Sequence, residues 1–128
     1  MSRFGCPASG PMDRLAHASA NAALGRPKDS TAIEISSGGL ELECEAGEVT
    51  YCVTGGEFRV VHAGCATTSW CVRTLRPGHI LSIRPGRWGS WAYLAFAGEL
   101  VCKQWAGRTA THSTSGFGGG CLSSGTAV

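Results

Sequence analysis

The sequence has little that would direct the chain to a membrane or to nucleic acid. Its 128 residues include no apolar stretch near the ~20 residues that a membrane-spanning helix requires. Its 11 Lys and Arg residues and 9 Asp and Glu residues give a formal net charge of +2, and neither sign forms a run. We therefore expect neither nucleic acid nor a lipid surface as a partner. The N-terminus also lacks a basic segment followed by an apolar one and a cleavage site, so we expect a cytoplasmic protein.

The cysteines and histidines lack the spacing of a metal site or a disulfide framework. There are seven cysteines, an odd number, and no C-x-x-C pair. Cys44, Cys52 and Cys102 lie in apolar or alternating segments, where a reduced thiol acts as a small hydrophobe. The four histidines are His17, His62, His79 and His112. They show neither the i,i+4 spacing nor the Cys–His pairing of zinc sites, so the sequence gives a metal site no support.

The first regular element that we predict is a helix from residue 13 to residue 24. The segment is almost free of β-branched residues, and Gly25 and Pro27 follow it, as is typical of a helix end. Most of its side chains are small, so we expect the helix to lie close against a sheet. The apolar residues expected on that side are Met12, Leu15, Ala16, Ala20 and Leu24.

After Asp29 the pattern changes to a period of two residues, which predicts strands. Residues 40–45 alternate apolar and acidic residues, as a strand with one buried face does. Five further segments are rich in β-branched or aromatic residues and are separated by Gly and Pro-Gly turns. They are residues 49–54, 58–62, 70–75, 79–83 and 91–97. Many short strands at regular spacing predict a mainly β sandwich or barrel with one N-terminal helix.

The turn that precedes the helix, residues 5–13, is a candidate site. Prolines and glycines shape it, and the start of a helix presents unpaired N–H groups and the positive end of the helix dipole. Such a turn can hold an anionic or carbonyl oxygen. The same spacing also fits an ordinary capped helix start, and local spacing does not separate the two interpretations.

Several motifs follow one another in a fixed order along almost the whole chain. They are Gly5-x-Pro7-x-Ser9-Gly10-x-Met12-Asp13, Ala20-Asn21, Gly25, Ala32-Ile33-Glu34, Thr54-Gly55, Tyr93-Leu94-Ala95-x-Ala97-Gly98 and Gly107-Arg108-Thr109-Ala110-Thr111. Together they resemble the signature of the biotin-dependent carboxyltransferase family. This family includes allophanate hydrolase subunit 2 and one of the subunits of the bacterial 5-oxoprolinase.

The resemblance implies a cyclophilin-like β-barrel with one N-terminal helix. It also implies that residues 1–128 form a single carboxyltransferase-type domain, the N-terminal half of the family's full-length chain. This half looks incomplete, since the family's opening strand and its Gln-Asp-x-Gly-Arg segment do not precede Met1.

The activity that the resemblance implies is that of an enzyme subunit acting on an amide. The first expectation is a 5-oxoprolinase-type hydrolase, in which partner subunits and ATP help to open 5-oxoproline to glutamate. The alternatives are biotin-dependent carboxyl transfer to urea or a similar amide, a regulatory module that antagonises a kinase inhibitor, and an inactive remnant. We expect no cofactor in this chain, and ATP or carboxybiotin in the complete complex. Residues 116–120 are rich in glycine but form no P-loop, because no Gly-Lys-Ser/Thr follows.

The resemblance also assigns catalytic residues to this sequence. Both reactions require a polarised amide and a stabilised oxyanion. Ser9 would supply a hydroxyl to the substrate carbonyl, and Asp13 or Glu34 would act as a base or accept a hydrogen bond from the amide N–H. The simpler interpretations are a helix cap for Asp13 and a solvated strand face for Glu34.

Four further residues are expected to bind the substrate. The backbone N–H of Gly10 would contact its carbonyl, and Arg108 with Thr109 would bind a carboxylate or bicarbonate. Ala110 stands where the family pattern leads us to expect serine. Asn21 is unfavourable in a helix interior, which indicates a specific hydrogen bond, either to the substrate or within the structure.

Overall fold

The computed structural model describes residues 9–112 and 115–128. The segment Asp13–Glu99 forms one compact unit, and the described residues before and after it form a second. Residues 5–8 of the predicted opening turn lie outside the described residues.

Helix α1 (Arg14–Ala23) confirms the predicted helix. Asp13 is its N-cap: the backbone is extended there, and Oδ1 accepts a hydrogen bond from the Ala16 N–H at 3.0 Å. The helix ends as predicted, because Gly25 takes a left-handed φ of 68° and donates its N–H to the carbonyl oxygen of Ala22. The described residues contain no helix that is long and apolar enough to cross a membrane.

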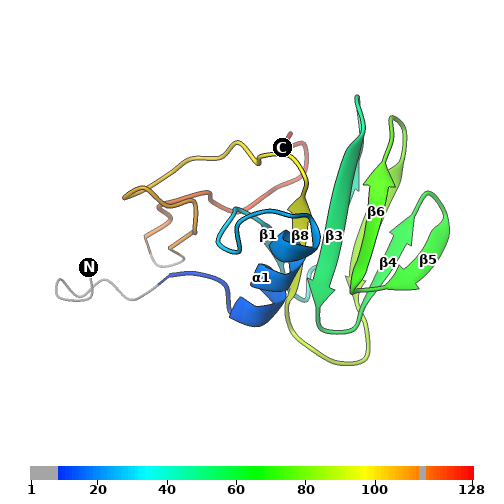
Figure 1. The fold of residues 1–128 in the computed structure, drawn as a ribbon, viewed down its shortest axis with the longest axis horizontal. Coiled ribbons are helices and arrows are strands. Elements are labelled where there is room, and N and C mark those ends of the chain that lie inside the picture. Colours follow the sequence, from blue (N-terminus) through cyan, green and yellow to red (C-terminus); the bar gives the residue numbers. More distant parts are fainter. Residues whose placement is uncertain (1–8, 113–114) are drawn as a thin grey trace. The chain divides into compact units, whose positions relative to one another are not determined.

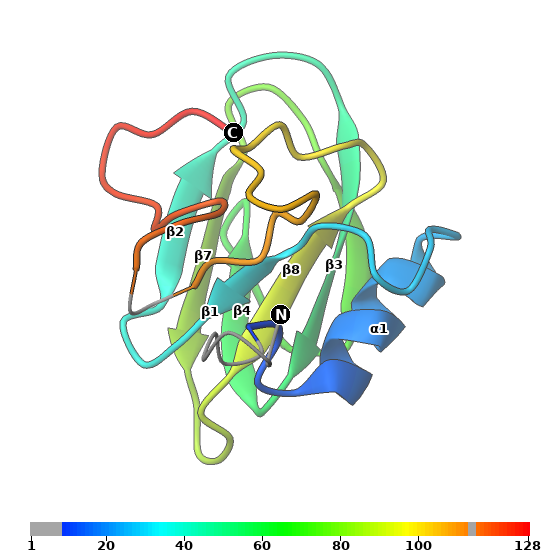
Figure 2. The same cartoon turned by 90° about the vertical axis from the view of Figure 1, so that its left-hand side faces the viewer.

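The strands of the described residues form two antiparallel four-stranded sheets (Figures 1 and 2). The order in the first sheet is β1 (Ile33–Ile35), β8 (Ala92–Phe96), β3 (Val49–Gly55) and β6 (Cys71–Leu75). The order in the second is β2 (Leu40–Glu43), β7 (Ile80–Pro85), β4 (Phe58–His62) and β5 (Cys65–Thr68). The predicted fold class, mainly β with one N-terminal helix, is confirmed. Within the described residues the two sheets remain separate ladders and do not close into a complete barrel.

The strand β5 was not predicted from the sequence. It is a four-residue edge strand whose side chains are mostly exposed, so no alternation of apolar and polar residues marks it. The predicted alternation of residues 40–45 does hold, since Cys44 is buried and the glutamates of β2 are exposed.

The buried face of α1 is narrower than predicted. Ala16 and Ala20 are buried and the helix packs on β3 and β8, and Leu24 packs partly buried beside them. The prediction is wrong for Leu15 and Met12, which are 76% and 66% exposed. Alanines four residues apart bring a helix close to a sheet along one narrow stripe, and Leu15 lies one residue off that stripe. Met12 precedes the helix.

Strand β8 is buried along its whole length. On one face, Tyr93 and Ala95 pack with Ala16, Ala20 and Cys52 beneath the helix. The alternate residues Ala92, Leu94 and Phe96 are buried on the opposite face. Because helix α1 covers one face of the first sheet, this strand has no solvated side and contributes to both parts of the core.

The second unit has little regular structure in its described residues. Two isolated bridges join Trp105 to Arg108 and His112 to Phe117. The rings of Trp105 and Phe117 are stacked, with their centroids 5.3 Å apart. Arg108 therefore lies at the end of a tight turn, where its backbone N–H and carbonyl both bond to Trp105.

Candidate functional site

Tyr93 joins two of the predicted catalytic residues. Its side chain is fully buried, and its hydroxyl donates a hydrogen bond to Glu34 Oε2 at 2.7 Å. The hydroxyl oxygen of Tyr93 also accepts a hydrogen bond from the backbone N–H of Asp13, at 2.7 Å. Asp13 and Glu34 are thus connected through one phenol.

The pairing of β1 with β8 explains how this contact arises. Glu34 and Tyr93 are register partners in the two antiparallel strands, so their side chains lie on the same face of the sheet. Helix α1 packs on β8 and brings its N-cap residue to the tyrosine hydroxyl. The start of the helix and the edge strand β1 therefore meet at Tyr93.

Burial raises the pKa of the Tyr93 phenol, and the Glu34 carboxylate raises it further. The hydroxyl therefore stays protonated at neutral pH and keeps donating to Glu34. A charge-assisted bond of this kind fixes one oxygen of the carboxylate, although the Glu34 side chain remains exposed.

Tyr93 was not among the predicted site residues, and its neighbours in the sequence are apolar. The feature of the sequence that could have identified Tyr93 as a site residue is its phenol hydroxyl. A tyrosine hydroxyl that is buried in an apolar strand needs a hydrogen-bond partner, and Tyr93 belongs to one of the ordered motifs.

Asp13 has the capping role that was one of its two predicted interpretations. Its Oδ1 accepts from the Ala16 N–H, and its side chain is exposed. A cap does not exclude a contact with substrate, since an ionised carboxylate accepts several hydrogen bonds. A catalytic role for Asp13 stays a prediction.

Two further side chains of α1 have defined partners, and one of them contacts Tyr93. The His17 ring packs edge-on against Tyr93, with centroids 5.7 Å apart, and burial lowers the pKa of this histidine. Asn21 is fully buried, and its amide nitrogen donates to the Ser30 carbonyl at 2.9 Å. This bond ties the helix to the loop that follows it. Among the described residues Asn21 Oδ1 has no hydrogen-bond partner. Substrate binding by Asn21 stays a prediction.

The other predicted site residues belong to the second unit. Ser9 and Gly10 are exposed, as is Arg108. Thr109 is half-buried, and its carbonyl accepts from the Gly119 N–H at 2.8 Å. The structure thus connects Asp13 with Glu34, and the participation of these four residues in the same site stays a prediction. No three His, Cys, Asp or Glu side chains within residues 9–112 and 115–128 are grouped so that they could hold a metal ion.

Comparison with known proteins identifies the class. The family model described as "Carboxyltransferase domain, subdomain A and B" matches residues 4–128, so the chain belongs to the carboxyltransferase domain family. The chain is 29% identical over 126 residues to a 5-oxoprolinase subunit of Haemophilus influenzae. That match covers 96% of this chain and 40% of the relative, so the chain spans less than half the length of that protein.

Solved structures with the same fold agree with this assignment. The urea amidolyase of K. lactis matches with a TM-score of 0.84 and 28% identity, over 91% of this chain and 7% of that one. The urea carboxylase of Kluyveromyces lactis matches with a TM-score of 0.83 and 26% identity, over 91% of this chain and 10% of that one. The resemblance stated from the motifs is therefore confirmed at the level of the family.

Proposed function

We propose that this chain forms part of a 5-oxoprolinase-type enzyme subunit that binds a cyclic amide and works with partner subunits and ATP. The observation that carries the proposal is the Asp13–Tyr93–Glu34 connection, in which a buried phenol orients an exposed carboxylate beside the start of a helix. The similarity to the 5-oxoprolinase subunit of Haemophilus influenzae supports the choice of substrate class.

In the proposed mechanism, Glu34 accepts a hydrogen bond from the N–H of the lactam. Tyr93 holds Oε2 of Glu34, so the carboxylate keeps one orientation and loses less conformational entropy when substrate binds. The family resemblance further assigns polarisation of the lactam carbonyl to Ser9 and Gly10, and binding of the substrate carboxylate to Arg108 and Thr109. Asp13 maintains the start of the helix and adds negative charge near the lactam nitrogen. ATP is bound by the complete complex.

Carboxyl transfer to urea or a similar amide is the second candidate. The similarity to the urea carboxylase of Kluyveromyces lactis supports it. The Glu34 carboxylate would then orient an N–H of urea. The two candidate functions therefore share the contact with the amide and differ in the co-substrate, which is ATP for the first and carboxybiotin for the second.

The test uses the complex reconstituted with its partner subunits and measures ATP-coupled opening of 5-oxoproline. We expect Glu34→Gln to lower kcat/KM about tenfold or more, because an amide no longer provides a charged acceptor. Glu43→Gln is the matched control, since Glu43 is an exposed strand glutamate outside the cluster. Equal rates in Glu34→Gln and the wild type would refute the mechanism.

Asp13 needs two variants because it caps the helix. Asp13→Ser keeps a capping oxygen and removes the charge, whereas Asp13→Ala removes both. Loss of activity in both variants supports a role for the carboxylate. Loss in Asp13→Ala alone assigns the residue to the cap. Transfer of carboxyl from carboxybiotin to urea, without opening of 5-oxoproline, would favour the second candidate.

A further inference from the structure

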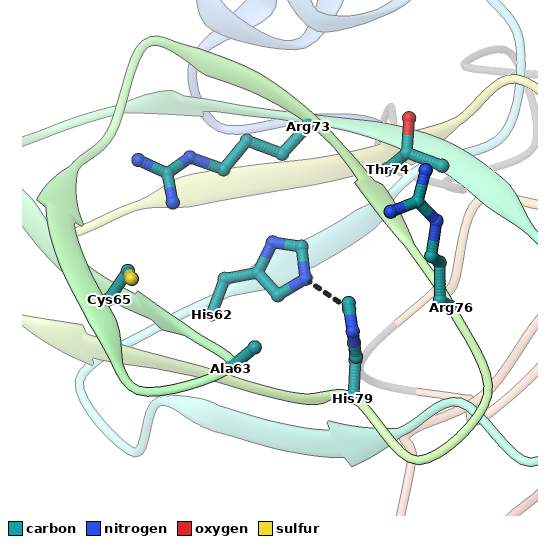
Figure 3. A pocket seen from close by; sticks show the side chains of 7 residues that line it. All are labelled: His62, Ala63, Cys65, Arg73, Thr74, Arg76 and His79. Carbon is teal, nitrogen blue, oxygen red and sulfur yellow. Dashed lines mark hydrogen bonds between the residues drawn. The ribbon is translucent and has the colours of Figure 1, made fainter.

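A second cluster of titratable side chains lies on the other face of the first sheet, away from Tyr93. It lines a pocket of about 410 Å³ that is formed by residues of β4, β5 and β6 and of the turns that follow β4 and β6 (Figure 3). The lining residues are His62, Ala63, Cys65, Arg73, Thr74, Arg76 and His79. None of them is acidic, and this volume is large enough for a small ligand.

A chain of hydrogen bonds runs from the core to this pocket. The hydroxyl of Tyr51 lies 3.0 Å from His62 Nδ1, and His62 Nε2 lies 2.8 Å from His79 Nδ1. Tyr51 is fully buried, His62 is 7% exposed and His79 is half-buried. The series of hydrogen bonds therefore ends at His79, whose other ring nitrogen, Nε2, is left for a ligand in the pocket.

The buried Tyr51 hydroxyl determines which atom donates in each of these hydrogen bonds. Burial lowers the pKa of His62, and the neighbouring His79 and Arg73 lower it further, so His62 is neutral near pH 7. The Tyr51 O–H then needs an acceptor, and the acceptor within reach is His62 Nδ1. With that nitrogen unprotonated, His62 donates from Nε2 to His79 Nδ1. His79 consequently carries its own proton on Nε2 and offers it as a donor.

Two arginines add positive charge to the same pocket. Arg73 is the register partner of Tyr51 across β3 and β6, so its side chain lies on the same face of the sheet as the phenol. Figure 3 shows the His62 ring between the Arg73 and Arg76 side chains. Arg76 also forms an ion pair with Glu48 at 3.1 Å, but both side chains are more than half exposed, so the pair is weak.

From this arrangement we propose that the pocket binds a phosphate group, either free or as a monoester. Two guanidinium groups and the His79 Nε2–H supply donors from several directions, which suits the oxygens of a tetrahedral dianion. A carboxylate has only two oxygens and would use fewer of these donors. The proposal is independent of the amide site, because Tyr51 and Cys52 alternate along β3 and only Cys52 lies on the Tyr93 face.

The first test examines the histidine tautomers by NMR of the intact chain labelled with ¹⁵N-histidine. We expect His62 and His79 both to carry their proton on Nε2 at neutral pH. A His79 that is protonated on Nδ1 would overturn the proposal. Tyr51→Phe removes the hydroxyl that requires His62 Nδ1 as an acceptor. In this variant we therefore expect a mixture of the Nδ1-protonated and Nε2-protonated tautomers.

The second test measures binding by calorimetry at constant ionic strength, with inorganic phosphate, phenyl phosphate and acetate as probes. We expect saturable binding of phosphate and weaker binding of acetate. Tighter binding of phenyl phosphate identifies a monoester as the ligand, and equal binding identifies free phosphate. Acetate that binds as tightly as both phosphates would overturn the proposal.

Arg73→Gln and His79→Gln test the residues themselves. We expect Arg73→Gln to weaken phosphate binding about tenfold or more, since one charge-assisted contact is lost. Arg59→Gln is the matched control, because Arg59 is an exposed residue of β4 that does not line the pocket. Equal weakening in both arginine variants would show attraction by net charge alone and would overturn the proposal.

Discussion

Replacing Tyr93 by phenylalanine tests the contact on which the candidate site depends. The substitution keeps the buried ring and removes a hydroxyl that makes two hydrogen bonds, one with the Asp13 N–H and one with the Glu34 carboxylate. A bond to a charged group contributes about 1.5–3 kcal/mol and a neutral one about 0.5–1.5 kcal/mol. Because Glu34 is exposed and regains water, we expect the free energy of unfolding to fall by about 2–3 kcal/mol.

The measurement is urea denaturation followed by tryptophan fluorescence, for which Trp91 is a natural reporter because it packs against the cluster beneath the helix. A double-mutant cycle of Tyr93→Phe with Glu34→Gln then isolates the bond between the two side chains, with an expected coupling of about 1 kcal/mol or more. A loss of less than about 0.5 kcal/mol in Tyr93→Phe, together with no coupling, would refute the reasoning, since both partners would then be satisfied without the phenol.

Three further predictions concern stability. Gly56→Ala places a Cβ 2.6 Å from Gly89 Cα, so we expect a loss of about 1–3 kcal/mol in urea denaturation, whereas the open position Gly98→Ala changes little. Burial raises the pKa of Tyr51 from 10.0 to about 12, so its protonated form stabilises the fold. This contribution is complete below pH 10 and decreases as the pH rises toward 12, and Tyr51→Phe should flatten that part of a stability-against-pH curve. Asp13→Ala should lower the melting temperature by removing the cap, at a cost of about 1 kcal/mol, while Asp13→Ser retains most of it.

Much of the fold follows from local sequence. The small-residue helix with its cap at Asp13 and its glycine end is visible in the order of the residues, and so is the alternation of residues 40–45. These signals are informative because helix caps and strand faces depend on neighbours a few residues apart. Strand β5 and the exposure of Leu15 escape prediction, since both depend on what the rest of the chain covers.

Much less of the two candidate sites could be predicted from the sequence. The family motifs name Asp13 and Glu34, but the phenol that connects them lies on β8, 80 residues beyond Asp13. His62 and His79 are 17 residues apart and form no motif. They meet because β4 pairs with β7, which places His79 two residues before the partner of His62. Strand pairing between distant segments is a property of the whole sheet, and local spacing does not contain it.

The long separation between helix α1 and strand β8 has a consequence for the way the chain folds. The helix leaves the ribosome long before β8 does, yet it packs on β8 as well as on β3. Until Tyr93 emerges, the first turn of α1 lacks the hydroxyl that holds its N-cap. A short helix of this kind is marginal on its own in water. We therefore expect docking of the helix to be a late, non-local step, and the amide site to assemble only when that step is complete.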